Sequence, residues 1–452
     1  MTTNDVERAD ALVMFGLTGD LGEKKLFPAL YELQASGRLG IPVVGVGRSE
    51  YTDEELDDML EESLAGYTPA SGGAVDPEVV DAIELSYVSG DSTDPATYDA
   101  LVDRLDGTAR PVVYGALPPG IFGDVARGIA GSSLPETTRL VCEKPFGNDV
   151  ESSRQLYDEI VEALDPSRLF IVDHFLAKSA IENMLTVRTS NPLIENSMCS
   201  RFVERIDIEM HEEGDVDGRG SFYESVGAID DVVQNHLLQM LAVLTMERPD
   251  DDSDEAYHTA RSTLLATVVP FDPEVAVIGQ YAGYRDLDDV DDDSQVETFV
   301  EARTTIDTDR WRDVPVTIRT GKALSSDSTV ATITLRSPGP DLVENRIRFE
   351  VKPRASVAID IGILDPSTHD TVPTTIVACA PEDHGELGDY AVMLDNALSG
   401  ATRHFARIDD VVAAWRLVAP LHSADLELHI YEPGTDGPAG SHPVSHPVSD
   451  IR

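Results

Sequence analysis

The chain has 452 residues, enough for two domains with substantial cores, and 34 basic against 83 acidic side chains give a formal net charge of −49. A protein this acidic is not expected to bind nucleic acid, because a phosphate backbone requires basic contacts. No apolar run approaches the roughly 18 residues that cross a bilayer, so no membrane-spanning segment is predicted and a membrane partner is not expected.

The start MTTNDVERAD lacks the pattern of a signal peptide, and the three cysteines are too widely spaced for a metal site. We therefore expect a cytoplasmic protein with reduced cysteines and no bound metal. Of the 34 basic side chains only six are lysines, and this arginine-rich, strongly acidic composition is typical of a high-salt cytoplasm, where ions screen the repulsion. The acidic runs at residues 250–255 and 286–293 are interpreted as solvated faces, with calcium binding as the alternative.

The first part of the chain alternates strand and helix signals. An apolar strand at residues 11–15 ends at Gly16 and is followed by a helical pattern at residues 24–36. Further strands are predicted at residues 42–47, 110–117, 139–142 and 169–172, and further helices at residues 51–64 and 152–164. Such alternation predicts an α/β domain with a doubly wound parallel sheet over residues 1–173.

Residues 174–440 have a different character. Stretches of alternating polarity predict antiparallel strands at residues 202–209, 299–305, 314–319, 329–335 and 346–351, with a long apolar helix at residues 228–245. The simplest interpretation is one α+β domain. The repeat SHPVSHPVSDIR predicts a disordered tail over residues 441–452.

Five of the six lysines lie in motif-like segments, beside a glycine-rich turn, a histidine or other polar groups: Lys24, Lys25, Lys144, Lys178 and Lys322. A compact ammonium group suits phosphate, so this placement predicts a site for anionic ligands. The alternative for each lysine alone is an ordinary surface residue.

The segment VMFGLTGDLGEKK places Gly16, Gly19 and Gly22 between a strand and a helix, where backbone amides can approach a pyrophosphate. The spacing is GxxGxxG rather than GxGxxG, so a plain tight turn is the alternative. The second strand ends in GVGRSE, where Arg48 suits a 2′-phosphate and the nearby Glu50 suits a ribose hydroxyl. The pattern favours NADP, with NAD as the alternative.

Two histidines lie in segments that predict a phosphate-binding pair and a general base. In VDHFLAKS, His174 and Lys178 lie one turn apart if the segment is helical, and two such donors suit a phosphate; the alternative is a surface pair with Glu182 near Lys178. In VVQNHLLQML, His236 follows polar neighbours that include Asp231, which suits a general base; the alternative is a hydrogen-bonded core histidine.

Together these motifs resemble one family, the glucose-6-phosphate dehydrogenases. The resemblance rests on segments in family order from residue 13 to about residue 440, among them GLTGDLGEKKLFPALYEL, GVGRS, YGALPP, EKPFG, DHFLAK, GAIDDVVQNHLLQML, RWRDVPVTIRTGKAL and RIDDVVAAWRLV. It implies a Rossmann-like N-terminal domain, a C-terminal domain with a large, mainly antiparallel sheet, and assembly as a homodimer or homotetramer.

The resemblance also implies an activity: oxidation of glucose 6-phosphate at C1 to the lactone, with hydride transfer to NADP. His236 would be the general base and Asp173 its charged partner. The other implied roles are phosphate binding by His174 and Lys178, sugar binding by Glu212, Asp231 and Lys322, a place between cofactor and substrate for Lys144, and dinucleotide binding by Gly16, Gly19, Lys25, Arg48 and Tyr114.

Several positions depart from the family pattern. Phe175 replaces a tyrosine, Ala177 a glycine and Asp230 an arginine, while Asp327 and Asp436 stand where basic or neutral residues are usual. A lost donor and added negative charge weaken phosphate binding. The alternatives are therefore a dehydrogenase of another or unphosphorylated aldose, or a non-catalytic protein that binds NADP or a sugar phosphate.

Overall fold

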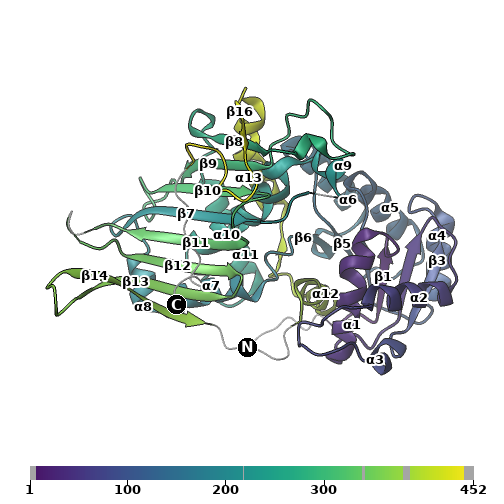
Figure 1. Cartoon of the computed structure of the whole chain (residues 1–452). Helices are drawn as coiled ribbons and strands as arrows, with labels where there is room; N and C mark the ends of the chain where they lie inside the picture. The colour runs from purple at the N-terminus through teal and green to yellow at the C-terminus, as the bar shows by residue number, and fades with distance from the viewer. Residues whose placement is uncertain (1–6, 217, 338, 340–341, 380–386, 442–452) are drawn as a thin grey trace. The chain divides into compact units, whose positions relative to one another are not determined.

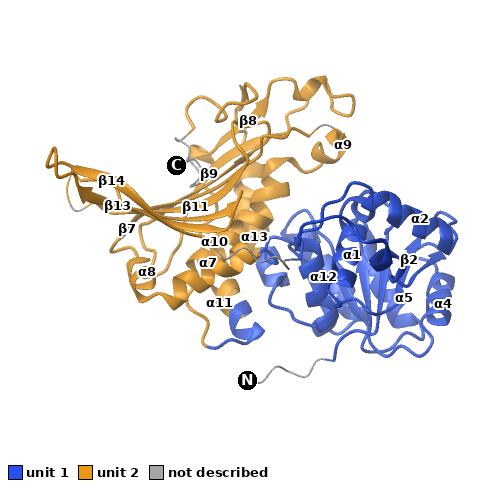
Figure 2. Cartoon of the chain, turned by 60° about the horizontal axis from the view of Figure 1, so that its bottom comes forward, with its two compact units in different colours: residues 1–178, 251–258, 382–412 blue, residues 179–250, 259–381, 413–452 orange. Residues whose placement is uncertain are grey.

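The computed structural model describes residues 7–216, 218–337, 339, 342–379 and 387–441. The chain divides into two compact units, coloured separately in Figure 2: unit 1 contains residues 1–178, 251–258 and 382–412, and unit 2 contains residues 179–250, 259–381 and 413–452. The first division comes close to the predicted boundary at residue 173. The return of two later segments to unit 1 has no counterpart in the contiguous domains predicted from the sequence. Nearly all of the predicted tail, residues 442–452, lies outside the described residues.

Unit 1 is built on a seven-stranded sheet with the strand order β15-β6-β5-β4-β1-β2-β3 (Figure 1). Its strands are β1 Ala11–Phe15, β2 Val43–Gly47, β3 Leu85–Ser89, β4 Pro111–Gly115, β5 Arg139–Cys142, β6 Leu169–Val172 and β15 Phe405–Ala406. All neighbouring pairs are parallel except β15 with β6. Strands β1 and β4 are buried along their whole length, as expected when helices cover both faces. The predicted doubly wound sheet is confirmed.

The helices of unit 1 begin and end at recognisable sequence signals. They are η1 Gly22–Leu26, α1 Phe27–Ala35, α2 Asp53–Leu64, α3 Pro77–Asp81, α4 Pro95–Arg104, α5 Phe122–Gly131, α6 Val150–Ala163 and α12 Asp389–Ser399. Helix α2, for example, starts with a capping box between Thr52 and Glu55 and buries a leucine at every fourth position.

Helix α12 belongs to the returning segment 382–412 and packs on α1. Its Leu394 and Leu398 join the same hydrophobic core as Leu30 of α1. Asp395 of α12 also binds Arg8 at 2.7 Å and Arg38 at 2.8 Å. The helix is therefore a structural part of unit 1, although more than 200 residues separate it from the first segment of that unit, residues 1–178.

Unit 2 contains a nine-stranded sheet with the order β14-β13-β12-β11-β7-β10-β9-β8-β16. Helices α7, α8 and α10 lie on one of its faces (Figures 1 and 2). The strands are β7 Val203–His211, β8 Val277–Tyr281, β9 Phe299–Thr305, β10 Pro315–Gly321, β11 Ser328–Leu335, β12 Arg346–Lys352, β13 Ser356–Leu364, β14 Thr371–Cys379 and β16 Leu428–Tyr431. The helices are α7 Ser179–Ser190, α8 Pro192–Ser197, α9 Gly220–Tyr223, the π-helix η4 Ile229–Leu237, α10 Leu238–Thr245, most of α11 Asp254–Thr267 and most of α13 Ile408–Ser423. No helix in the described ranges is long and apolar enough to span a bilayer.

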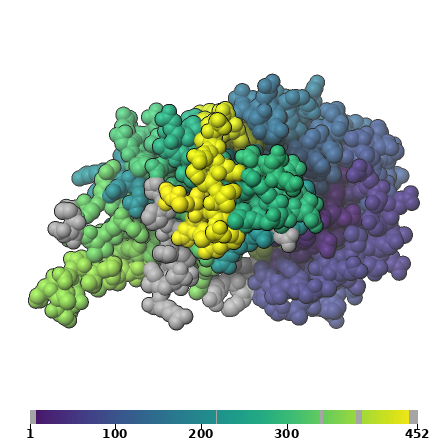
Figure 3. Space-filling model, turned by 45° about the horizontal axis from the view of Figure 1, so that its top comes forward, coloured from purple at the N-terminus to yellow at the C-terminus, as the bar shows by residue number. Residues whose placement is uncertain are grey.

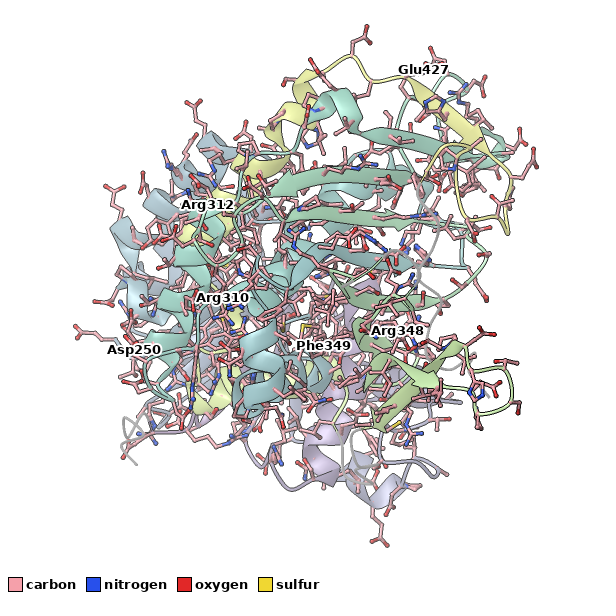
Figure 4. All side chains as sticks on the ribbon, turned by 90° about the vertical axis from the view of Figure 1, so that its left-hand side faces the viewer. Asp250, Arg310, Arg312, Arg348, Phe349 and Glu427 are labelled. Atoms are coloured by element: carbon pink, nitrogen blue, oxygen red, sulfur yellow. The ribbon has the colours of Figure 1, made fainter. Side chains whose placement is uncertain are left out.

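Side chains alternate between two faces of this sheet. Figure 4 labels Arg348 and Phe349, consecutive residues of β12, which leave the strand on opposite faces. Both residues are buried: Phe349 belongs to a strand that α7 contacts, and the Arg348 guanidinium is paired with Asp360 of β13 at 2.8 Å. The period of two that predicted these strands therefore reflects one apolar and one polar face.

The expectation of a mainly antiparallel sheet is confirmed, and two of its neighbouring pairs are parallel. Strand β10 runs parallel to β7, with Gly321 beside His211, and β16 runs parallel to β8. Alternating polarity reports that a strand has one buried face, but it carries no information about direction. The parallel pair has a consequence for the site, because Glu212 and Lys322 follow the carboxyl ends of neighbouring strands at the same edge of the sheet.

Candidate active site

The turn after β1 has a geometry that only glycine fits. Gly16 has a φ of +79°, and a Cβ there would lie 2.3 Å from the carbonyl oxygen of Ala116. The Gly19 N–H donates to the Gly16 carbonyl at 3.1 Å, and a Cβ on Gly22 would lie 1.6 Å from the Leu17 oxygen. The turn connects β1 to η1. In the sheet, β1 lies between β4 and β2, which is the point where the strand order reverses and where such sheets bind dinucleotides. The chain thus has a cradle that fits a dinucleotide.

Basic side chains around this turn are exposed. Lys25 extends from η1, and the neighbouring Lys24 binds Asp20 at 3.1 Å. Arg48 is exposed directly after β2. Hydrogen bonds from Thr93 hold the pKa of Asp91 below its usual value, and the Arg48 charge adds to this effect. The placement of Lys25 and Arg48 fits the dinucleotide role that the sequence predicts.

Tyr114 lies in β4, fully buried, and its hydroxyl donates to the Glu143 carboxylate. Burial raises the pKa of Glu143, while hydrogen bonds from Tyr114, the Lys144 N–H and Tyr390 act in the opposite direction. The Lys144 N–H reaches the Glu143 Oε2 at 3.2 Å. The role of Tyr114 in dinucleotide binding stays a prediction, and the structure gives its hydroxyl a partner within unit 1.

Asp173 follows β6 and is buried, and its Oδ1 accepts a hydrogen bond from the Phe175 N–H at 3.0 Å. Residues 174–177 form consecutive turns, with the Lys178 N–H donating to the Phe175 carbonyl at 3.1 Å. From the sequence we expect His174 and Lys178 on one face of a helix. The segment is not a helix, so the two side chains do not share a helical face. The Lys178 ammonium lies 5.2 Å from the centre of the Phe175 ring.

Two residues that the sequence analysis did not single out lie beside this turn. The ring of Tyr390 stacks on His174 with centroids 5.7 Å apart and planes at 22°. The carboxylate of Asp389 forms an ion pair with Lys178. Both residues begin α12, and no local pattern links them to a segment more than 200 positions earlier. The predicted phosphate residues thus have an aromatic and an anionic neighbour supplied by the returning segment.

A second charged cluster lies in unit 2, at the edge where β7 and β10 end. The buried Lys322 ammonium binds the Glu212 carboxylate and lies 3.9 Å from the Asp231 Oδ2. It also lies 5.7 Å from the ring centre of the buried Tyr223. Glu212 and Asp231 keep side-chain exposures of 26% and 17%, so a small ligand can reach them. Two carboxylates and one ammonium offer the acceptors and the donor that sugar hydroxyls require.

Asp231 and His236 lie in the π-helix η4, which contacts both β7 and β10. Helices with this wider hydrogen-bond pattern are rare and are frequently found at functional sites. His236 is 3% exposed, and its N–H donates to the Asn235 Oδ1 at 2.6 Å. The Asn235 amide donates in turn to the Asp230 carbonyl at 2.9 Å. The imidazole is thus carried by a tightly bonded segment.

The acidic departures from the family pattern have partners in unit 2. Asp327 binds Lys352 at 2.5 Å, Asp230 binds His422 at 2.8 Å, and Asp436 accepts from the Ser325 hydroxyl at 2.5 Å. The hydrogen bond to Asp230 raises the pKa of His422. Asp327 and Lys352 also border a cavity of about 350 Å³ that reaches Glu212. The negative charges of Asp327 and Asp230 are therefore partly neutralised by Lys352 and His422. In the described residues no three His, Cys, Asp or Glu side chains are grouped closely enough to hold a metal ion.

Comparison with known proteins agrees with this geometry. The family described as "Glucose-6-phosphate dehydrogenase, NAD binding domain" matches residues 13–183, and "Glucose-6-phosphate dehydrogenase, C-terminal domain" matches residues 185–447. The chain is 35% identical over 442 residues to glucose-6-phosphate 1-dehydrogenase 1 of Mycobacterium tuberculosis, covering 95% of this chain and 93% of that protein. It is 31% identical over 461 residues to glucose-6-phosphate 1-dehydrogenase of Saccharomyces cerevisiae, covering 96% and 90%.

Solved structures give the same result. The crystal structure of glucose-6-phosphate 1-dehydrogenase from Mycobacterium avium matches with a TM-score of 0.90 and 34% identity, covering 97% of this chain and 99% of that one. A glucose-6-phosphate dehydrogenase in complex with its substrate glucose 6-phosphate matches with a TM-score of 0.89 and 28% identity, covering 96% and 97%. The chain therefore belongs to the glucose-6-phosphate dehydrogenase family.

Proposed function

We propose that this chain oxidises glucose 6-phosphate at C1 to 6-phosphogluconolactone with NADP as the cofactor, the first step of the pentose phosphate pathway. The observation that carries the proposal is the cluster of Lys322, Glu212 and Asp231, held by the parallel pair β7–β10 in a chain that matches the family over almost its whole length. Such a cluster can bind a polyhydroxylated ligand and fix its orientation.

The cofactor would be held by the turn that contains Gly16 and Gly19, with Lys25 and Arg48 for its phosphate groups. NADP, when bound, supplies the acceptor for the hydride that leaves C1. Arg48 is an exposed guanidinium at the end of β2, which suits a 2′-phosphate and favours NADP over NAD. Tyr114 and Lys144 complete the cofactor side of the proposal.

On the sugar side, Glu212 and Asp231 would accept hydrogen bonds from hydroxyl groups and Lys322 would donate one. His236 would take the proton of the C1 hydroxyl, so that the C1–O bond becomes the carbonyl of the lactone as the C1–H bond breaks. Asp173 would support the positive imidazolium that forms, since a carboxylate stabilises that charge.

His174 and Lys178 would bind the phosphate of the substrate, with Phe175 as an apolar wall in place of a tyrosine donor. Lys178 already holds one anionic partner, the Asp389 carboxylate, which the substrate phosphate would displace. We propose in addition that the protein works in the cytoplasm as a homodimer or homotetramer, as the family resemblance implies. A relative from Arabidopsis thaliana carries the description "cytoplasmic", and a solution mass equal to one chain would contradict the assembly.

The function is tested by following nicotinamide reduction with glucose 6-phosphate or glucose, each with NADP or NAD, in buffers of low and high KCl. The proposal predicts rapid reduction of NADP with glucose 6-phosphate and formation of the lactone, which hydrolyses to 6-phosphogluconate. Turnover of glucose but not of its phosphate would contradict it and favour an unphosphorylated aldose as the substrate.

A further inference from the structure

The helix that carries Asp231 and His236 starts without a cap of its own. The residue before η4 is Ala228, which has no side-chain acceptor for the first free N–H groups of the helix. Glu297, nearly 70 residues later, provides acceptors for two N–H groups at the start of the helix. Its backbone carbonyl accepts from the Ala228 N–H at 3.0 Å, and its carboxylate Oε1 accepts from the Ile229 N–H at 2.9 Å.

The fit between Glu297 and this helix start is close. Gly227 precedes Ala228 with a φ of +62°, and a Cβ at Gly227 would lie 2.4 Å from the Glu297 Oε1. The carboxyl therefore lies against the bare Cα of the glycine as well as against the Ile229 N–H. A side chain at residue 227, or a shorter one at residue 297, would change where η4 begins.

The residue that follows Glu297 contacts the other half of the sugar cluster. The Thr298 carbonyl accepts a hydrogen bond from the Lys322 N–H at 2.9 Å, and the Tyr431 hydroxyl donates to the Lys322 carbonyl at 2.7 Å. Residues 297 and 298 thus bond to the start of η4 on one side and to Lys322 on the other. They therefore connect the segment of Asp231 to the segment of Lys322, whose charged atoms lie 3.9 Å apart.

The surroundings hold Glu297 in place. Residues 282–296 lead into it from β8, the strand that pairs with the C-terminal strand β16. In Figure 3 the C-terminal segment is the yellow one, next to green. The Gln280 amide donates to the Val296 carbonyl at 2.9 Å, and Ser294 binds Glu224 at 2.6 Å. The titratable groups that act on the carboxyl are Asp230 of η4, His422 of α13, Tyr223 of α9 and Tyr284, the first residue of the short helix η6 Tyr284–Asp286.

We propose that Glu297 is a positioning residue for the dehydrogenase reaction, which fixes the start of η4 and hence the places of Asp231 and His236 relative to Lys322. The inference rests on the proposed roles of those three residues. The role requires the length of the glutamate side chain and an acceptor oxygen at its end. It does not require a negative charge, because a neutral amide oxygen at the same place also accepts the hydrogen bond from the Ile229 N–H.

Two variants separate reach from charge. Glu297→Gln keeps the length and the acceptor, and it should keep kcat/KM for glucose 6-phosphate within about fivefold of the wild type. Glu297→Asp keeps the charge but is one methylene too short, and it should lower kcat/KM by about 100-fold, the effect of a displacement of roughly 1 Å at a catalytic group. Neither should change the Kd of NADP, which the proposal assigns to unit 1.

Glu350→Asp is the matched control, because it shortens a buried carboxylate of the same unit that accepts from Ser356 at 2.8 Å, on strands β12 and β13. It should lower the melting temperature and leave kcat/KM unchanged. All assays are run well below each melting temperature. The inference is overturned if Glu297→Asp is as active as the wild type, or if Glu297→Gln loses as much activity as Glu297→Asp. A wild type that does not turn over glucose 6-phosphate would instead contradict the proposed function.

Discussion

Replacing Asp389 with asparagine is expected to tighten the binding of glucose 6-phosphate. In the free protein the Lys178 ammonium is paired with the Asp389 carboxylate, and a phosphate that binds Lys178 has to displace this partner. The two side chains are 24% and 39% exposed, and a partly exposed ion pair contributes about 1 kcal/mol or less. Removing the competitor returns that energy to the substrate, which corresponds to a KM up to roughly fivefold lower.

The assay measures kcat and KM for the Asp389→Asn variant with NADP saturating, at low and at high KCl. The fall in KM should be larger at low salt, because ions screen exposed charges. Glucose has no phosphate, so any KM measured with glucose should not change. Asp395→Asn is the control on the same helix, since Asp395 binds Arg8 and Arg38 rather than Lys178.

An unchanged or higher KM for glucose 6-phosphate in Asp389→Asn would refute the reasoning. So would an equal fall in the KM for glucose, because the effect would then have no connection with the phosphate. A fall in both variants would show that the mobility of α12, and not the charge at residue 389, controls binding.

Three further predictions concern other parts of the two units. Gly16→Ala should weaken NADP binding by at least tenfold in a fluorescence titration, because its Cβ would meet the Ala116 oxygen at 2.3 Å; unaltered affinity would contradict the assigned turn. Lys322→Met should lower kcat/KM by over about 100-fold and destabilise the fold by about 3 kcal/mol in urea unfolding, since it leaves the carboxylates of Glu212 and Asp231 without their cation; a stable, active variant would refute this. Burial raises the pKa of Glu297 to about 7 from an ordinary 4.5, so its contribution to stability is full below pH 4.5 and is lost as the pH rises to about 7. The free energy of unfolding of Glu297→Gln should therefore rise by up to about 3 kcal/mol relative to that of the wild type between pH 4.5 and 7. Subtracting the two pH profiles removes the contribution of buried His211, whose pKa is lowered to about 4 and which makes the protein more stable as the pH rises. A difference between the two proteins that does not change with pH would refute the prediction.

The first sheet was predictable because its signals are local. Runs such as residues 11–15 and 139–142 are short, apolar and bounded by turns, and each became a buried strand with nearly the predicted ends. The return of residues 382–412 to unit 1 was not predictable in this way. Helix α12 has an ordinary amphipathic sequence, and nothing in its own residues identifies α1 as its partner.

The residues of the candidate site also divide into those with local sequence signals and those placed by contacts distant in the sequence. The glycine turn, His236 and Lys322 were found because each lies in a compact motif whose chemistry can be read from neighbouring residues. Asp389 and Tyr390 were missed because their importance comes from contacts across more than 200 residues. The closeness of Glu212 and Lys322 depends on the parallel pairing of β7 and β10, which alternating polarity cannot distinguish from antiparallel pairing.

The departures from the family pattern show a further limit of sequence reasoning. Asp327 and Asp230 were interpreted as negative charges that weaken phosphate binding. The structure pairs them with Lys352 and His422, so a large part of that charge is already compensated. Lys352 was the one lysine outside a recognised motif, and its partner could be identified only from the fold.

The most direct test of the central claim is the turnover of the His236→Asn variant with glucose 6-phosphate and NADP. Asparagine preserves much of the size and polarity of the side chain but cannot take a proton from the C1 hydroxyl. We predict a kcat at least about 1,000-fold below that of the wild type, with unchanged Kd values for NADP and glucose 6-phosphate. Turnover within tenfold of the wild type would show that His236 is not the general base, and the proposed mechanism would be wrong.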